Sequence, residues 1–440
     1  MKLTSLITAL AITLTGQASA GTLEEWFAKQ SEKRGDIPKV DLSFDNPESI
    51  AKSKQQVWEA YRKGAIKNGL DKLIPKKAMT IEDWVVDKKF QPRSLKIGDK
   101  TMPYVVLTKG EKPATGWPVY FCLHGGGGNP NAKGPHSWDV NTREWFAQMQ
   151  LATKVWESPG IYIIPRMADD RQGRWYYSWN QQFIDIMTQQ AILFNEADPN
   201  RIYLEGISEG GYAAYRLGSM MADRWAGSCS LAAAEPLGTS PPENLRHVAF
   251  RCGIGEKDTM FDRVGLARTY FKTLAELAAK HDGQYIHFHD EQKGRGHGID
   301  YKEGPQWISS YKRNPIPSAI TWTVIKQHDR HRQRSYWLAL DDKLDKFPLY
   351  LTADSNRKTN IINITAHQMK DGKKVPATGL NMRVYLSDKL VNLAEPVTIN
   401  VNGKNVFKDI AKPSAEALIK SIAERGDPNQ VFTTQVKLKL

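Results

Sequence analysis

The chain has 440 residues, of which 40% are hydrophobic and 25% charged, and it carries a formal net charge of +13 at pH 7. This size and composition allow a large buried core and two or three domains, and they exclude fibrous and disordered proteins. The positive charge could favour an anionic partner such as an acidic polysaccharide, although solubility alone explains it. Because lysines and arginines are spread along the chain and not interleaved with aromatic residues, we expect no nucleic-acid partner.

The first twenty residues have the form of a secretory signal peptide. Lys2 supplies a positive charge, residues 6–14 are largely apolar, and Ala18-Ser19-Ala20 offers a cleavage site of small residues. We therefore expect an exported protein, secreted or periplasmic, whose mature chain begins at Gly21. The apolar run is too short to span a bilayer and nothing later is longer, so we expect no stable membrane insertion. An uncleaved N-terminal anchor is the alternative.

The pattern of apolar residues changes near residue 93. Before it, helical spacing over residues 47–69 predicts an N-terminal helical arm (residues 21–92) that packs on the main domain. After it, short strand candidates alternate with helices, which is typical of an α/β domain with a parallel sheet; we assign it residues 93–317. The predicted strands are residues 104–108, 119–123, 161–164, 202–205, 228–232, 248–253 and 285–290, and the predicted helices are 180–194, 212–221 and 264–280.

Beyond residue 317 the helices give way to successive strand-like runs, which predicts a separate β-rich domain over residues 318–440. Asn402-Gly403, inside the run 397–407, predicts a two-residue hairpin because both positions tolerate positive φ. The other predicted elements are strands at residues 320–325, 335–340, 349–352, 361–365, 382–386 and 431–438 and a helix at 415–424.

Three cysteines are too few for a disulfide framework. Cys122, Cys229 and Cys252 each lie in an apolar strand-like run, where a cysteine is usually a small core residue. A single bridge remains an alternative.

A G-x-S-x-G motif centred on Ser208 is the first chemical signal. The motif alone is weak, but here a turn and the strand 202–205 precede it and a helix follows it, as in a nucleophile elbow. Gly206 and Gly210 supply the small neighbours that such a strained turn needs. The start of the following helix favours negative charge that develops at the serine.

A glycine run after His124 follows the strand 119–123 and precedes the serine in the chain. Such a loop donates one oxyanion N–H, which we assign to Gly126, and the second donor is the N–H of Glu209, the residue after the nucleophile. Losing one such donor costs about 3 kcal/mol of transition-state stabilisation. A phosphate-binding loop is the rival, but no Lys-Ser or Lys-Thr follows the glycines.

A serine on such an elbow takes an acid and then a histidine later in the chain. We favour His297, in a glycine-rich loop after the strand 285–290, and Asp258, in the loop after 248–253. Glu235, after the preceding strand, is the alternative acid. Residues interpreted as structural or solvated are His281, His287, His289, His328, His331, His367, Glu256 and Asp262.

Together these segments resemble the polyhydroxybutyrate-depolymerase and feruloyl-esterase group of α/β-hydrolases, and they are similar to prolyl-oligopeptidase-type catalytic domains. The resemblance covers about residues 93–317 and is specific for serine hydrolysis, not for one substrate. The segments that carry it are residues 201–211, the glycine run after His124, residues 255–258, and the His297 loop with Trp307.

The resemblance implies an α/β-hydrolase fold with a mostly parallel sheet and helices on both faces. It implies Ser208 as nucleophile, Asp258 as acid and His297 as base, and hydrolysis of an ester through an acyl-enzyme. No metal or cofactor is required, since the short His/Asp runs 287–290 and 328–331 are more typical of strand and loop residues than of metal ligands. The lack of paired cysteines near the site argues against a polyester substrate, which stays an alternative.

An aromatic and basic segment follows the strand 161–164 and should lie near the active-site edge of the sheet. Its side chains could stack a sugar or phenolic ring and bind a carboxylate, or could simply pack the loop. We expect an acyl ester of a carbohydrate as substrate. The candidate substrate-binding residues are Arg171, Arg174, Trp175, Tyr176 and Trp179.

Two other classes of function stay open. A serine peptidase of the prolyl-oligopeptidase type is disfavoured because the residues before His124 are too few for several propeller blades of about 40 residues. A non-catalytic binding protein that works through the β-rich domain is disfavoured by the complete Ser, Asp and His set.

Overall fold

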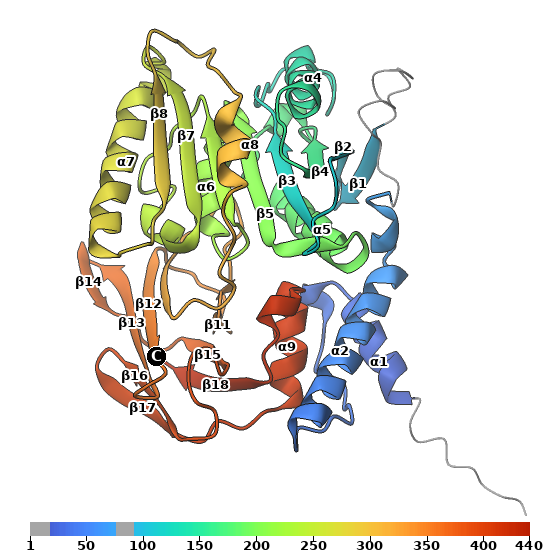
Figure 1. The fold of residues 1–440 in the computed structure, drawn as a ribbon, viewed down its shortest axis with the longest axis vertical. Helices are drawn as coiled ribbons and strands as arrows, with labels where there is room; N and C mark the ends of the chain where they lie inside the picture. Colours follow the sequence, from blue (N-terminus) through green and yellow to red (C-terminus); the bar gives the residue numbers. More distant parts are fainter. Residues whose placement is uncertain (1–17, 76–91) are drawn as a thin grey trace, which may run out of the picture.

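The computed structural model describes residues 18–75 and 92–440. A large α/β unit occupies the upper half of Figure 1, and a β-rich unit and a pair of N-terminal helices lie below it. The signal segment predicted over residues 1–20 lies outside the described residues apart from its last three, with which helix α1 (Ala18–Ala28) begins. No helix in the described ranges is long and apolar enough to cross a membrane.

The α/β unit is built on an eight-stranded sheet with the order β1-β2-β4-β3-β5-β6-β7-β8. β2 runs antiparallel to both β1 and β4, and the other neighbours are parallel. The strands are β1 (Arg93–Ile97), β2 (Lys100–Lys109), β3 (Trp117–Leu123), β4 (Gly160–Pro165), β5 (Ala197–Ile207), β6 (Gly227–Leu231), β7 (Ala249–Gly255) and β8 (His287–Gln292).

Helices cover both faces of this sheet (Figure 1). Successive side chains of a strand point to opposite faces, so Phe121 and Leu204 pack with α5 (Ser178–Phe194), α6 (Glu209–Met220) and α7 (Arg263–Lys280). Tyr120 and Tyr203 pack on the other face with α4 (Asp139–Lys154) and α8 (Glu303–Ile308). A mostly parallel sheet between two helical layers confirms the predicted α/β-hydrolase fold.

The C-terminal part contains two further sheets around a shared apolar core, which confirms a β-rich region there. The predicted hairpin turns at Asn402 (φ 48°) and Gly403 (φ 78°). The single strand predicted over residues 335–340 is two short strands, because Tyr336 has a φ of 51° and turns the chain between them.

The strands of these two sheets pair as follows. The smaller sheet has the order β10 (Arg334–Ser335), β11 (Leu338–Leu340), β15 (Asn381–Leu386), β18 (Thr434–Lys439). The larger has the order β17 (Lys404–Asp409), β16 (Val397–Val401), β13 (Ile361–Lys370), β12 (Leu349–Asn356), β9 (Ala319–Val324), with β14 (Lys373–Pro376) beside β13.

The end of the N-terminal arm packs on the α/β unit, as expected, but its two helices pack mainly elsewhere. α2 (Pro47–Lys67) begins at a capping box between Asn46 and Ser49 with a proline in its first turn. Its apolar side chains and those of α1 share a core mainly with α9 (Ala415–Arg425), the helix that precedes the last strand. The two helices of the arm therefore lie mainly against the C-terminal part, where their apolar side chains share a core with those of α9 (Figure 1).

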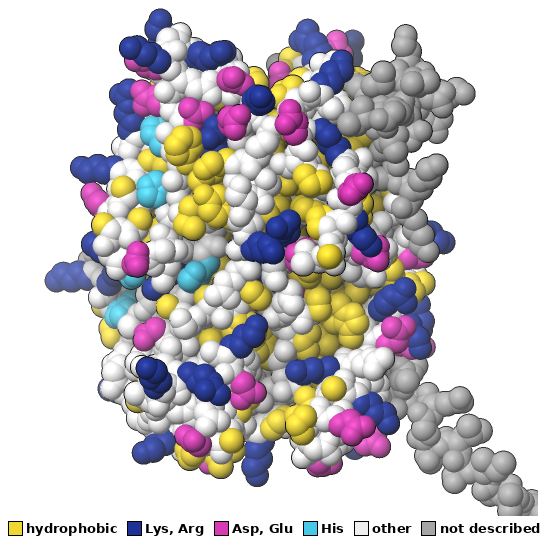
Figure 2. Space-filling view, in the orientation of Figure 1, with side chains coloured by type: hydrophobic (Ala, Val, Ile, Leu, Met, Phe, Trp, Pro, Cys, Tyr) yellow, Lys and Arg dark blue, Asp and Glu magenta, His cyan; other side chains and the backbone are white. Residues whose placement is uncertain are grey.

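The surface charges and the three cysteines lie as the sequence analysis predicts. On the face in Figure 2, Lys and Arg side chains are scattered among Asp and Glu and do not form one block.

Cys122, Cys229 and Cys252 are buried and free, so the alternative of a disulfide bridge is not realised. Burial raises the pKa of the Cys252 thiol to about 12, which leaves it protonated and inert.

Candidate active site

Ser208 stands at a strained turn between β5 and α6, with φ 51° and ψ −109°. Its backbone N–H donates to Leu231 O at 2.8 Å, which fixes the turn against β6. A Cβ on Gly206 would lie 2.1 Å from the Gly210 carbonyl oxygen, and a Cβ on Gly210 would lie 2.0 Å from the Leu123 carbonyl oxygen. Both positions therefore need glycine, as the nucleophile elbow requires.

The structure brings the three predicted catalytic residues together. His297 Nε2 lies 3.1 Å from Ser208 Oγ, and His297 Nδ1 lies 2.7 Å from Asp258 Oδ2. Asp258 follows β7 and His297 follows β8, and these parallel neighbours end at the same edge of the sheet as β5. The arrangement lets His297 accept a proton from Ser208 while Asp258 holds its other ring nitrogen.

Arg263, at the start of α7, is a further polar partner of this set that the sequence analysis missed. Its Nη1 donates to Asp258 Oδ1 at 2.8 Å, and its Nε donates to the Tyr212 hydroxyl at 2.7 Å. Asp258 and Arg263 are both buried, with side chains 3% and 6% exposed. The acid is therefore fixed from two sides.

The alternative acid, Glu235, is engaged elsewhere. Arg216 donates to both of its carboxylate oxygens, at 2.6 and 2.9 Å, and the Thr239 hydroxyl donates at 2.8 Å. Glu256 is more than a solvated charge, because it accepts from Gly294 N–H at 2.7 Å and so pins the loop that carries His297.

The glycine run passes directly beside the nucleophile. A Cβ on Gly125 would lie 3.4 Å from Ser208 Cβ. Gly126 has a φ of 94°, and a Cβ there would lie 2.2 Å from Asn141 Oδ1, so only glycine fits. Within the described chain the Gly126 N–H makes no hydrogen bond, and Glu209 opens α6, where N–H groups lack helical partners. Both N–H groups are thus available for an oxyanion.

A buried polar network holds this loop. Asn141 accepts from Gly127 N–H at 3.0 Å and donates to Gly127 O at 2.9 Å and to Asp170 Oδ1 at 2.7 Å. Arg166 donates to both oxygens of Asp170, at 3.0 and 2.9 Å. Because every partner is satisfied, the loop is preorganised and need not reorganise during a reaction.

His124, which opens the glycine run, has a structural role. Its Nδ1 lies 2.6 Å from Gly125 O, and its Nε2 accepts from Met167 N–H at 2.9 Å. Burial lowers the pKa of His124 to about 3. The ring therefore stays neutral and braces the loop.

Glu209 places an acid and an arginine next to the nucleophile. Its side chain is buried, and Arg174 Nη1 lies 2.5 Å from Glu209 Oε2. Burial raises the pKa of Glu209 to about 7 in spite of this ion pair. The Arg174 side chain itself is 47% exposed, so it can also meet a ligand.

The prediction that Trp175 stacks a substrate ring is wrong. Its side chain is 1% exposed, and its Nε1 donates to His124 O at 2.8 Å, because the ring packs under the glycine run as part of the core. Arg171 is exposed, but Asp169 accepts from its Nε and Nη2, both at 2.9 Å. Its charge is thereby tied to the loop.

The other two aromatic candidates are partly buried. Tyr176 lies under the guanidinium of Arg216, 4.2 Å from the ring centroid. Trp179 lies under Lys100 Nζ at 5.2 Å and packs edge to face on Tyr177. Both rings mainly hold the loop, and Arg174 is the candidate best placed for a ligand.

An exposed apolar pair beside the acid was also missed. Met260 and Phe261, in the short turn between Asp258 and α7, are 61% and 73% exposed. Phe261 has a φ of 56°, and the Arg263 guanidinium lies 5.2 Å from its ring centroid. The signal was present in the sequence as two large apolar residues in a loop after the acid.

No protein-family model matches this sequence, and no curated protein matches it. Among solved structures, a thermostable esterase is similar with a TM-score of 0.35 and 17% identity, over 52% of this chain and 61% of that one. A ferulic acid esterase has a TM-score of 0.32 and 16% identity, over 50% and 93% of the two chains. The ferulic acid esterase of the anaerobic fungus Anaeromyces mucronatus has a TM-score of 0.30 and 15% identity, over 51% of this chain and 92% of that one. At this degree of likeness, function has to follow from the side chains of the site.

Proposed function

We propose that this protein is a serine hydrolase that cleaves carboxylic esters through an acyl-enzyme on Ser208. The observation that carries the proposal is the hydrogen-bonded chain from Ser208 through His297 to Asp258, on a strained turn beside a preorganised glycine loop. These are the elements of nucleophilic catalysis by serine, and each comes from a different loop at one edge of the sheet.

In the first half-reaction Ser208 Oγ attacks the ester carbonyl carbon, and His297 Nε2 takes the hydroxyl proton. The carbonyl oxygen becomes an oxyanion that accepts from the N–H groups of Gly126 and Glu209. When the intermediate collapses, His297 returns the proton to the departing alcohol. Water then attacks the acyl-enzyme with His297 as base, and the carboxylic acid leaves. Asp258 holds Nδ1–H and stabilises the imidazolium throughout.

A peptide amide is the alternative substrate. Prolyl-oligopeptidase-type peptidases carry a propeller of several four-stranded blades. Within the described residues 18–75 the chain forms α1, α2 and two short 3-10 turns, Ser31–Lys33 and Leu70–Lys72, and no strand. Cleavage of peptide amides is the outcome that would favour the alternative.

The substrate we propose is an acyl ester of a carbohydrate in which a carboxylate or a phenolic ring lies near the scissile bond. Arg174 supports a carboxylate, because it is half exposed and, among the residues that the structure describes, only its Nη1 is engaged, by Glu209. Phe261 supports an aromatic ring, because it is exposed beside the acid loop.

Labelling and turnover test the catalytic assignment together. Wild type should react with a fluorophosphonate probe and hydrolyse feruloyl, acetyl, short aliphatic or uronate methyl esters, and Ser208→Ala should do neither. Ser310→Ala, which alters an exposed serine after α8, is the matched control and should behave as wild type. Persistent labelling of Ser208→Ala, or faster turnover of peptide anilides than of every ester, would overturn the proposal.

Substrate choice is tested by a pair of arginines with equal side-chain exposure, both 47%. Arg174→Gln should raise KM for esters that carry a carboxylate by about tenfold, the loss of one charged hydrogen bond, and leave neutral esters unchanged. Arg171→Gln should leave KM unchanged for both kinds of ester, because the guanidinium of Arg171 is already bound by Asp169. Equal effects of the two substitutions would remove Arg174 from the substrate site.

We also propose that the protein is exported and cleaved after Ala20. The proposal is supported by the charged, apolar and small-residue segments of the first twenty residues. Mass spectrometry of the protein recovered from the cell envelope or medium should give a chain that begins at Gly21, and an intact N-terminus in the cytoplasm would contradict it.

A further inference from the structure

A second cavity system lies away from the catalytic residues, where the β-rich unit meets α9. One cavity of about 550 Å³ is bounded by residues 329–334, which lead into β10, by the end of α9 and by Arg383 of β15. A larger cavity of about 1240 Å³ adjoins it, and Arg330, Arg332 and Arg425 line both. Neither is lined by Ser208, Asp258 or His297.

The wall of the smaller cavity is strongly basic. Its acids are Asp329, Asp341 and Glu424, and its basic residues are twice as many, namely Arg330, Arg332, Arg334, Lys343, Arg383 and Arg425. Two of the acids are already taken by one arginine, because Arg383 donates to Glu424 at 2.7 Å and to Asp341 at 2.6 Å.

Two of the remaining arginines of the wall share one carboxylate that lies outside it. Arg332 and Arg330 both bind Asp185 of α5, at 2.7 and 3.0 Å, and Arg224 approaches the same carboxylate at 3.5 Å. One negative charge thus serves three arginines. The wall of the smaller cavity, taken together with Arg224, Asp185 and Asp223, holds seven basic side chains and five acids, so positive charge is in excess there.

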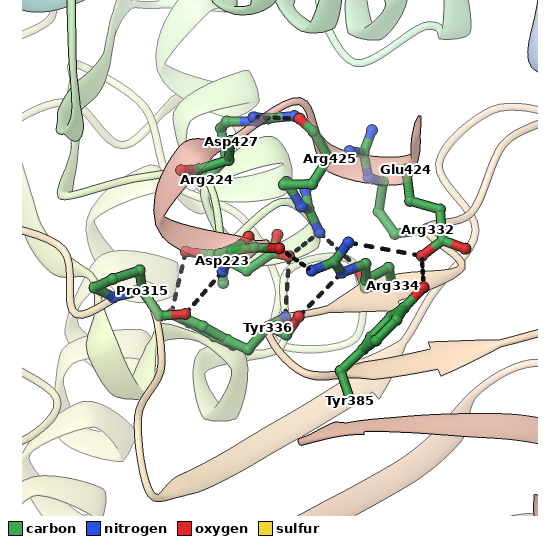
Figure 3. Close-up of polar contacts among 12 residues, drawn as sticks. Asp223, Arg224, Pro315, Arg332, Arg334, Tyr336, Tyr385, Glu424, Arg425 and Asp427 are labelled. Atoms are coloured by element: carbon green, nitrogen blue, oxygen red, sulfur yellow. Dashed lines mark hydrogen bonds and ion pairs between the residues drawn. The ribbon is translucent and has the colours of Figure 1, made fainter. Parts of the chain in front are cut away.

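Several guanidinium N–H groups here have no acceptor among the described residues. Arg425 is 1% exposed and bonds Asp223 and Arg334 O through Nη2 only, which leaves its Nε and Nη1 without partners. Arg330 Nη1 is likewise unpaired. Figure 3 shows the side chains of Arg334 and Arg425 gathered between Asp223 and Glu424. Buried charged donors without acceptors are costly, and they point to a missing acceptor.

Electrostatics at Arg425 agree with this picture. Burial, together with the positive charges of Arg224, Arg334 and Arg332, lowers the pKa of Arg425 to about 9 although Asp223 is bound to it. An additional anion at this place would therefore stabilise the cluster.

We propose that the smaller cavity binds the oxyanion group of a small ligand, a phosphate, sulfate or carboxylate on a molecule about the size of a sugar. Its volume is within the range of about 300–1,000 Å³ of small-molecule sites. Lys343 is exposed, Arg330 is half-buried and Arg332 lies deeper, so the basic side chains lead from the surface into the cavity. This site is independent of the proposed ester hydrolysis.

Titration of the full chain tests the proposal. Inorganic phosphate, sodium sulfate and glucuronate are titrated separately, by calorimetry and by thermal unfolding, at one ionic strength made up with chloride. At least one probe should bind saturably and raise Tm, and the ranking of the three identifies the anionic group. Arg330→Gln should weaken that binding about tenfold. This variant should hydrolyse an ester substrate at the wild-type rate, which shows that it is folded.

Two further variants keep the test decisive. Arg268→Gln removes an exposed arginine that pairs with Glu291 on the α/β unit, and it should leave the affinity unchanged. Lys343→Gln, at the exposed rim, should weaken binding a few-fold and carries the test if Arg330→Gln does not fold. The proposal is overturned if no probe binds more tightly than chloride, or if Arg268→Gln weakens binding as much as the two cavity variants do.

Discussion

Arg263 holds Asp258 by the carboxylate oxygen that His297 does not use, with Nη1 at 2.8 Å from Oδ1. The same guanidinium donates through Nε to Tyr212, which lies one helical turn after Ser208 on α6. Arg263 thereby ties the acid loop to the helix that carries the nucleophile. Its position makes it a positioning residue, because it reaches the reacting atoms only through Asp258 and His297.

Replacing Arg263 by methionine should lower kcat more than it raises KM. Without Arg263, Asp258 becomes free to rotate away from His297. The expected loss in kcat is about 10 to 100-fold, which is typical when a residue that positions a catalytic group is removed. Stability should fall by about 3 kcal/mol because a buried carboxylate loses its ion-pair partner. Steady-state kinetics and thermal unfolding measure the two effects.

Arg263→Lys is the matched variant for this prediction. A lysine keeps the charge but cannot donate to Asp258 and Tyr212 in the geometry of a guanidinium, so it should restore most of the stability and only part of kcat. A kcat that tracks stability across both variants would instead indicate a purely structural role.

The choice of acid can be tested by a pair of isosteric substitutions. Asp258→Asn should lower kcat by about 10⁴-fold, because the amide oxygen turns to the Arg263 donor and the amide N–H then donates to His297 Nδ1, which selects the unproductive tautomer. Glu235→Gln should cost less than about tenfold, because Glu235 bonds Arg216 and Thr239 and not His297. Kinetics with one ester substrate compare the two, and the reverse ranking would exchange the roles.

Much of the α/β unit was predictable because its strands are buried on both faces. β3 and β4 are continuous apolar runs between turns, and each predicted strand of the sheet overlaps an observed one. β1 was missed because its RSLKI sequence alternates exposed polar residues with only two apolar ones. α4 was also missed, although Trp145, Met149 and Ala152 follow helical spacing.

The site was predictable only where chain order constrains it. Ser208, Asp258 and His297 each follow a strand, and parallel strands end at one edge, so their meeting follows from topology. Arg263 and Asn141 carry no motif, and their roles depend on side-chain directions that periodicity does not give. Trp175 was misassigned because an aromatic residue in a loop packs inward as often as it faces a ligand.

Gly126→Ala tests the oxyanion loop. The added methyl group would lie 2.2 Å from Asn141 Oδ1 at a backbone φ of 94°, so the loop must move away from Ser208. Loss or displacement of one oxyanion donor predicts a fall in kcat of about 100-fold or more with little change in KM. Gly298→Ala, next to His297 but with nothing within 4 Å of the new Cβ, should keep near wild-type kcat. Equal losses in both would show that any added methyl near the site is harmful and would remove the specific role of Gly126.

Glu209 should make stability depend on pH between about 4.5 and 7. Burial raises the pKa of Glu209 from 4.5 to about 7, so the native protein binds this proton more tightly than the unfolded chain does. The contribution is fully present below pH 4.5 and is lost as the pH rises through 7. Because the side chain is 3% exposed, the full change is on the order of 3 kcal/mol. Thermal unfolding across this pH range measures it.

Glu209→Gln should flatten that dependence, because an amide is neutral at every pH and still accepts from Arg174. Glu291→Gln is the matched control, since Arg268 lowers the pKa of Glu291 and its contribution has the opposite sign, lost as the pH falls below 4.5. The difference in Tm between wild type and Glu209→Gln should therefore grow steadily in favour of the variant from pH 4.5 to pH 7. A constant difference over this range would mean that Glu209 is already ionised at pH 4.5, held there by Arg174 against the cost of burial.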